Sequence, residues 1–241
     1  MSTAVRQSYF KPTMENGGYW EYYRDLEKQF EDYLGYVPYL SGNEVTYSFR
    51  LANLLLAIGA HIDSAFKEIA RYPDFSTKYP EIMCPKTKSG KKREPNIRDY
   101  YPISSEYQLP KRKAMFKRLP EREQVIPFEN YVKVGNGIDT PKWWQVYNDV
   151  KHNLSENLEK ANLRNVRDAL AGAFLLNIIH TPVYIRLVEQ GIVKPKPTGS
   201  PIAINVFIVS KEWGEKFKAK GSEAKKIGAV ETPLFSYNYA E

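Results

Sequence analysis

The sequence predicts a mostly α-helical fold, a bundle of helices with a small β element, and three observations carry this prediction. Apolar residues recur every three or four positions over residues 44–72 and 162–179, as on one face of a helix. Prolines interrupt residues 73–140 so often that no long helix fits there. A short run of apolar and β-branched residues at 202–209 has the pattern of a strand.

We expect a single domain. The chain has 241 residues, of which 42% are hydrophobic and 26% charged, as in an ordinary globular protein. Residues 1–17 show no periodicity and are predicted to form a flexible tail. Residues 18–241 are then one helical domain. It contains a long irregular, basic insertion at 73–140 and a β or irregular segment at 195–241.

Two amphipathic helices open the predicted domain. Aromatic and apolar residues at three- and four-residue steps predict a helix over residues 18–33, ended by Gly35. The pattern over residues 44–72 is the strongest in the chain, and it ends before Pro73 because proline cannot continue the hydrogen-bond ladder.

One flank of the second predicted helix is polar. Small alanines beside this stripe leave room for a neighbouring helix or a ligand, and we expect the stripe to face the helix at 142–153. The alternative is a polar seam whose side chains are satisfied by hydrogen bonds between packed helices. The stripe contains Arg50, Asn53, His61, Ser64 and Glu68.

A third helix is predicted over residues 142–153, with Thr140 as its N-cap. Its apolar face contains Trp143, Val146 and Val150, while Trp144 lies on the opposite side. Side chains able to hold a phosphate or move a proton line the border between the two faces, namely Tyr147, Asn148, Lys151 and His152. The alternative is that these polar groups only bond neighbouring backbone at a helix end.

The run from Trp144 to His152, followed by residues 161–163 and an apolar helix, resembles proteins of the HEPN superfamily. The resemblance implies a helical bundle, often dimeric, that binds RNA or nucleotides, and many members are metal-independent ribonucleases. Their usual motif is an Arg, four to six residues, then a His. His152 matches the His, but positions 145–147, where the Arg is usual, hold none. This departure leaves catalysis open.

The ribonuclease hypothesis assigns roles to individual residues. His152 would transfer the proton and Asn148 would orient the substrate. Lys151 and Arg50, the latter from the polar stripe, would stabilise the charge on the phosphate. The expected binding residues are Tyr147, Trp144, His61, Glu68 and Asn53. The partners that the resemblance implies are RNA or a nucleotide and a second copy of the chain.

Two other functions are compatible with the sequence. Because the usual Arg is missing, the chain is alternatively a non-catalytic accessory module that dimerises through a surface rich in its 18 tyrosines. It is also compatible with an enzyme acting on a small molecule, which would use Arg50, His61, Glu68 and His152 in a pocket between helices.

The charge is concentrated. The net charge is +7, and residues 86–122 contain twelve Lys or Arg against four Asp or Glu. Such a segment attracts polyanions, or it is a solvated region that only keeps the protein soluble. Within it, residues 86–93 are predicted to form a basic loop and residues 111–119 a short basic helix.

Composition argues against several classes of protein. The one cysteine, Cys84, excludes an internal disulfide, and three histidines are too few for a multi-histidine metal site, so we expect no metal and no cofactor. No apolar run approaches a membrane span and no signal sequence precedes the domain, so we expect a cytoplasmic protein without a membrane partner.

Overall fold

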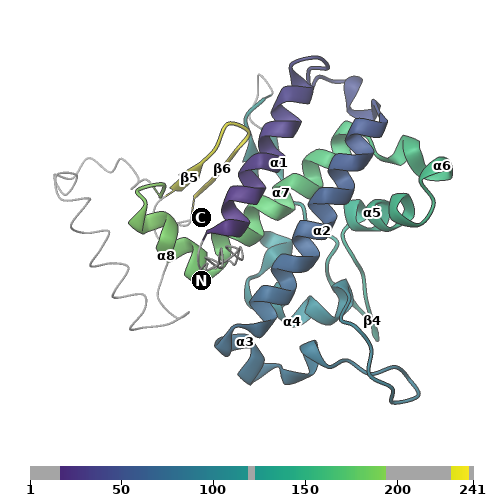
Figure 1. The fold of residues 1–241 in the computed structure, drawn as a ribbon, viewed down its shortest axis with the longest axis vertical. Helices are drawn as coiled ribbons and strands as arrows, with labels where there is room; N and C mark the ends of the chain where they lie inside the picture. Colours follow the sequence, from purple (N-terminus) through teal and green to yellow (C-terminus); the bar gives the residue numbers. More distant parts are fainter. Residues whose placement is uncertain (1–16, 119–122, 194–228, 239–241) are drawn as a thin grey trace, which may run out of the picture.

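The computed structural model describes residues 17–118, 123–193 and 229–238. These residues are mostly helical with a small antiparallel sheet (Figure 1). The longer helices are α1 (Gly18–Leu34), α2 (Phe49–Arg71), α5 (Lys142–His152), α7 (Leu163–Ile179) and α8 (Thr181–Glu189). The shorter ones are α3 (Pro73–Lys78), α4 (Tyr101–Glu106), α6 (Leu154–Asn157) and the 3-10 turns η1 (Asn43–Val45), η2 (Pro80–Met83), η3 (Ile97–Tyr100), η4 (Leu109–Lys111) and η5 (Leu158–Lys160).

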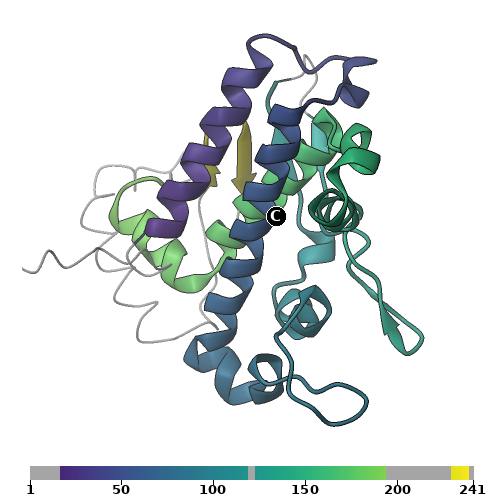
Figure 2. The same ribbon diagram turned by 45° about the vertical axis from the view of Figure 1, so that its right-hand side comes forward.

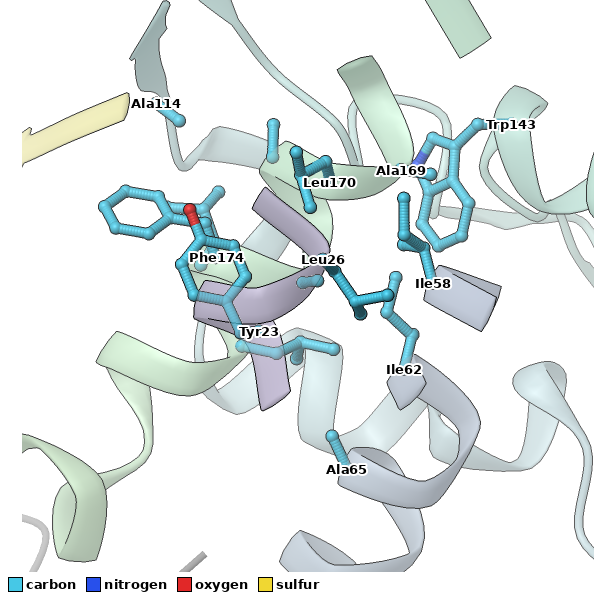
Figure 3. Close-up of a cluster of buried hydrophobic side chains, with 14 of the residues drawn as sticks. Tyr23, Leu26, Ile58, Ile62, Ala65, Ala114, Trp143, Ala169, Leu170 and Phe174 are labelled. Carbon is cyan, nitrogen blue, oxygen red and sulfur yellow. The ribbon is translucent and has the colours of Figure 1, made fainter. Parts of the chain in front are cut away.

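The centre of the fold is made by α1, α2 and α7, which pack against one another, while α5 packs against both α2 and α7 (Figure 1). Figure 3 shows the cluster of buried side chains between these helices. It includes Tyr23 and Leu26 from α1, Ile58 and Ile62 from α2, and Leu170 and Phe174 from α7. Burying this apolar surface is the main stabilising contribution to the fold.

Helix α2 is shorter than predicted at its start. The Ser48 hydroxyl accepts a hydrogen bond from the backbone N–H of Leu51 at 3.1 Å, which caps the helix there rather than at Glu44. The preceding residues form η1 and an extended stretch that pairs with the start of α7. The predicted end before Pro73 is confirmed.

Helix α7 is buried on nearly every side, whereas the sequence predicts one apolar face. It lies between α1, α2 and α5, which together cover its surface. Its start is fixed by Asn162, whose side chain accepts a hydrogen bond from the backbone N–H of Asn165. A break at His180 separates α7 from α8, as the predicted boundary requires.

No single helix in the described part of the chain has the length and hydropathy needed to cross a membrane. Helices α7 and α8 meet the length and composition test only as a pair, and a bend of 78° separates them.

The sheet combines distant parts of the chain in the antiparallel order β2-β1-β6-β5. Phe235 of β6 stacks on Phe174 of α7 with ring centroids 5.7 Å apart, and Phe116 of β1 lies beside it. The sheet therefore extends the helical core rather than forming a second one. Its strands are β1 (Ala114–Phe116), β2 (Glu123–Val125), β5 (Ala229–Glu231) and β6 (Phe235–Asn238).

The predicted basic helix at 111–119 is wrong. The turn η4 is followed by strand β1, in which Ala114 and Phe116 are buried and Met115 is half-buried. Alternate burial is the pattern of a strand at the edge of a core, and it outweighs the helix propensity of the flanking lysines. Strands β5 and β6 lie within the β or irregular segment predicted at 195–241, although no periodicity in the sequence marks these two short strands.

The rest of the insertion at 73–140 consists of short elements, as predicted. A second, two-stranded sheet is formed by β3 (Lys133–Val134) and β4 (Gly137–Ile138). The turn between them contains Gly135, whose φ of 55° lies in the left-handed region that favours glycine. Most of the predicted tail and the predicted strand at 202–209 lie outside the described residues.

Helix α5 approaches α2 closely at Gly59. A Cβ atom at this position would overlap the ring of Tyr147. At Gly172 of α7 the fit to α5 is looser, because an added Cβ would meet Trp143 at 3.2 Å. Glycine at position 59 therefore sets the distance between α2 and α5.

Replacing Gly59 by Ala is expected to destabilise the fold by about 1–3 kcal/mol, because the methyl group forces the Tyr147 ring out of a packed interface. Gly172→Ala is the matched control, since both substitutions gain helix propensity of about 1 kcal/mol. Urea unfolding measures the two free energies. Equal stability of the two variants would contradict the close contact.

Candidate functional site

Helix α5 carries most of the predicted site, but its burial differs from the prediction. Pro141, not Thr140, occupies the N-cap position, and no side chain caps the helix there. Trp144 is buried, not on a solvent face, and its ring centroid lies 4.9 Å from that of Tyr147. Both rings are buried because α5 packs against two helices, α2 and α7. Together these helices cover more of the surface of α5 than the single apolar face that the sequence predicts.

The polar groups of α5 lie at its exposed end. His152 and Lys151 are exposed in the last turn, and Asn148 is half-buried. The Lys151 Nζ atom lies 5.5 Å from the centroid of the Tyr147 ring, a cation–π contact. Among the residues that the structure describes, no hydrogen bond or ion pair joins Arg50 to any of these three side chains. His152, Lys151 and Asn148 lie at an exposed helix end, and no described side chain hydrogen-bonds to the imidazole to fix its orientation.

The polar stripe of α2 does not face α5, which corrects the prediction. Its exposed members Asn53 and Ser64 lie about 120–140° around the helix from Gly59, the residue that touches α5. Arg50 is also exposed and Glu68 is half-buried. The stripe is therefore a solvent surface between α1 on one flank and α5 on the other.

His61 is the one residue of the stripe that is buried, and its neighbours come from α1 and α7. The ring centroids of Tyr19 and Tyr22 lie 5.4 Å and 5.3 Å from the imidazole centroid. Asn177 of α7 lies behind the ring, with its Nδ2 atom 3.0 Å from His61 Nε2. His61 thus faces α1 and α7, whereas His152 is exposed in the last turn of α5, and no contact joins the two rings in the described part of the chain.

The hydrogen bonds of Asn177 fix the tautomer of His61. The Asn177 amide nitrogen donates to the Ala173 carbonyl at 2.9 Å, so the atom facing His61 Nε2 is a donor. Nε2 must then accept, and the proton is on Nδ1. Burial lowers the pKa of His61 to about 4, so the ring is neutral at neutral pH.

The sequence indicated Tyr19 and Tyr22 only as part of an amphipathic helix. Their three-residue spacing places both rings on one side of α1, but the spacing is equally typical of core packing. No sequence signal pairs them with His61, about forty residues away. Asn177 lies at helical spacing with the apolar residues of 162–179, and nothing in the sequence pairs it with His61.

The pKa of His61 predicts how stability depends on pH. The unfolded ring titrates near 6.5 and the folded ring near 4, so the unfolded state binds more protons between these values. Stability is therefore expected to fall as pH falls from 6.5 to 4, by up to about 3 kcal/mol from this residue.

The variant His61→Gln removes the titrating ring and keeps an oxygen able to accept from Asn177. Its unfolding free energy, measured in urea at several pH values, should lose less between pH 6.5 and pH 4 than that of the unchanged protein. Parallel pH profiles for the two proteins would show that His61 is not neutral and buried.

The basic loop at 86–93 has a defined structure, and we call it the basic arm. Lys86 and Lys92 pair as an antiparallel bridge, and the backbone N–H of Thr87 donates to the carbonyl of Lys91 at 2.8 Å. Gly90 adopts a φ of 80°, which closes the turn.

The arm presents four exposed lysines. Lys86, Lys88, Lys91 and Lys92 make no ion pair with any described residue. Arg93, at the base, instead binds Asp99 through two hydrogen bonds of 2.6 Å and 2.7 Å. The arginine is thus structural, and the lysine charges remain available to a polyanion.

The β3–β4 hairpin projects from the same end of the molecule as the basic arm, which Figures 1 and 2 show from two directions. The Arg98 Nε–H donates to the Ile138 carbonyl at 3.2 Å, which ties β4 to the segment that follows the arm. Lys133 adds an exposed charge to this end.

Within residues 17–118, 123–193 and 229–238, no group of three or more His, Cys, Asp or Glu side chains is placed to hold a metal ion. Comparison of the chain with known protein families, with curated proteins and with solved structures finds no match.

Proposed function

We propose that this protein is a HEPN-like helical bundle that binds RNA, and that the basic arm is its contact with the phosphate backbone. The observation that carries the proposal is the exposed set of four lysines on one closed turn. Lysines placed on a hydrogen-bonded hairpin lose less backbone entropy on binding than the same residues on an unstructured tail. Each phosphate neutralised by a lysine releases counterions, which supplies sequence-independent affinity.

The geometry supports RNA binding better than RNA cleavage. A general base requires a partner that orients it and a nearby group that stabilises the developing charge. His152 is exposed without an orienting partner in the described structure, and the Arg of the HEPN motif is absent from positions 145–147. We therefore place the ribonuclease second, with His152, Lys151, Asn148 and Arg50 as its predicted residues.

Replacing all four arm lysines by Gln is expected to weaken binding of a single-stranded RNA by at least tenfold at low salt. The slope of log K against log salt should fall by about 3, since each lost phosphate contact removes about 0.7. Fluorescence anisotropy of a labelled RNA over a series of salt concentrations measures both quantities.

Lys28→Gln is the control for a change of charge alone, since Lys28 is exposed on α1 and outside the basic arm. It should lower affinity less than Lys88→Gln. If the two single variants bind equally, or if the fourfold variant keeps the original salt slope, the arm is not the RNA contact.

The ribonuclease hypothesis is tested by assaying RNA cleavage. RNA incubated with the protein and a chelator is expected to remain intact to the same extent with the unchanged protein and with His152→Ala, as gel electrophoresis of the RNA will show. A cleavage product that appears only with His152 present would contradict this expectation and make the protein a nuclease.

The alternative function, a non-catalytic module that dimerises, is favoured by one surface. The connector between α1 and α2, together with the first residue of α2, exposes several large apolar side chains, with Tyr36 81% and Phe49 66% accessible. Such groups mark contact surfaces when they gather in one region. The others in this segment are Leu40, Val45 and Tyr47. Sedimentation velocity gives the mass in solution, and a dimer that forms without RNA would favour this function.

A further inference from the structure

The β5–β6 hairpin meets α1 at one buried carboxylate (Figure 1). Glu27 of α1 is 1% exposed. Its Oε1 atom accepts hydrogen bonds from the backbone N–H of Leu234, at 3.1 Å, and from the Thr232 hydroxyl. Both donors belong to the turn between β5 and β6, and 205 positions separate Glu27 from Thr232 in the sequence. One side chain therefore joins an early helix to the last described strands.

The turn of the hairpin is held in shape by its own hydrogen bonds. The Thr232 N–H donates to the Phe235 carbonyl at 2.8 Å, and the Phe235 N–H donates to Thr232 Oγ1 at 3.0 Å. The single hydroxyl proton of Thr232 has two acceptors within reach, the Glu27 carboxylate and the Phe235 carbonyl at 3.1 Å. A hydrogen bond to a carboxylate is the stronger of the two, so we assign the proton to Glu27.

The hairpin is also attached to the core by packing and by a short ladder. Phe235 lies between Phe174 of α7 and Phe116 of β1, with ring centroids 5.7 Å and 5.5 Å away. Backbone pairing with β1 covers the positions Met115–Ser236 and Phe116–Phe235. Strands this short have few backbone hydrogen bonds, and such elements open at a lower free energy than the helices of a core. The hairpin is therefore able to open while α7 stays folded.

The charged groups around Glu27 come from α1, from the residue after β1 and from the hairpin itself. Arg24 forms an ion pair with Glu27 Oε2, and its side chain is 35% exposed. Lys117 donates to the Thr232 carbonyl at 2.9 Å and pairs with Glu231 at 2.7 Å. A cavity of about 440 Å³ opens beside the carboxylate. Its other charged lining residues are Glu21, Asp25, Lys28, Glu31 and Asp32.

Burial raises the pKa of Glu27, and the hydrogen bonds and Arg24 oppose this effect without cancelling it. The neighbouring Tyr23 hydroxyl stays neutral, because burial raises its pKa and the Glu27 carboxylate raises it further. When the hairpin opens, the Glu27 side chain reaches water and titrates near its ordinary value of 4.5. The docked hairpin thus binds a proton more readily than the open one. Docking strengthens as pH falls through the raised value, and the gain is complete below the ordinary value.

We propose that the β5–β6 hairpin is a strap that opens separately from the helical core, and that proton uptake by Glu27 tightens its docking on α1. The proton adds to Oε2, because Oε1 is engaged by the turn of the hairpin. Arg24, whose side chain is partly exposed, then turns toward water. This effect is opposite in sign to that of His61, through which the whole fold loses stability as pH falls. The proposal does not depend on RNA binding by the basic arm.

The test is amide hydrogen exchange in the full-length protein, followed by NMR at about pH 7 and about pH 5 and corrected for the intrinsic rate at each pH. The Leu234 amide should exchange at least about tenfold faster than the most protected amides of α7, because local opening exposes it. Its protection should rise at least about threefold in the more acidic sample, whereas that of α7 should not rise. Equal exchange at the two places, or Leu234 protection that stays constant or falls in acid, would overturn the proposal.

Glu27→Gln keeps Oε1 as an acceptor and removes the titrating group. Its Leu234 protection should not depend on pH and, at neutral pH, should at least equal that of the unchanged protein, because no charge is buried. Asp25→Asn is the matched control, since Asp25 is exposed on the same helix and should leave the pH dependence as it is. The same pH dependence in Glu27→Gln as in the unchanged protein would remove Glu27 from the proposal.

A second variant serves if circular dichroism shows that Glu27→Gln does not fold. Thr232→Val removes the hydroxyl that donates to Glu27. It should lower the protection of the Leu234 amide several-fold at neutral pH, while the amides of α7 keep theirs. Leu234 protection equal to that of the unchanged protein would show that the contact with Glu27 does not hold the hairpin.

Discussion

The burial of α7 is the constraint on which the rest of the structure depends. Helix α7 contacts α1, α2 and α5. Its Phe174 ring stacks on Phe235, which joins the sheet to the helical core. A helix covered on all sides gains the hydrophobic contribution of its whole surface and has no freedom to rotate. Helices α1, α2 and α5 each cover a different part of the surface of α7. This arrangement places α1 and α5 on opposite flanks of α2.

That arrangement decides which residues of α2 are available to a ligand. The face toward α7 and the contact at Gly59 are closed by packing. The remaining face carries Ser64, and His61 at its edge is covered by Tyr19 and Tyr22. Only the His61 edge of the polar stripe is covered by α1, and the exposed members Arg50, Asn53 and Ser64 face solvent. The surface at His152 is left as a separate, open feature.

The basic arm lies on the irregular insertion, apart from the packed helices. Its four exposed lysines present charge without a shaped surface, so the RNA binding proposed for it would be independent of base sequence. A pocket between α1 and α2 is instead lined by side chains from two helices of the core, whose packing holds them in place.

The sequence alone determined the helices, because local periodicity and capping report directly on helix formation. Helices α1, α2, α5 and α7 and the irregular insertion follow from patterns within about twenty residues, although α2 begins at Phe49 rather than Glu44. Only the tertiary structure decided that Trp144 is buried, that residues 114–116 form a strand and that His61 meets Tyr19, Tyr22 and Asn177. These outcomes depend on contacts between distant segments. An amphipathic pattern predicts that one face of a helix is buried, but it does not identify the element that covers that face.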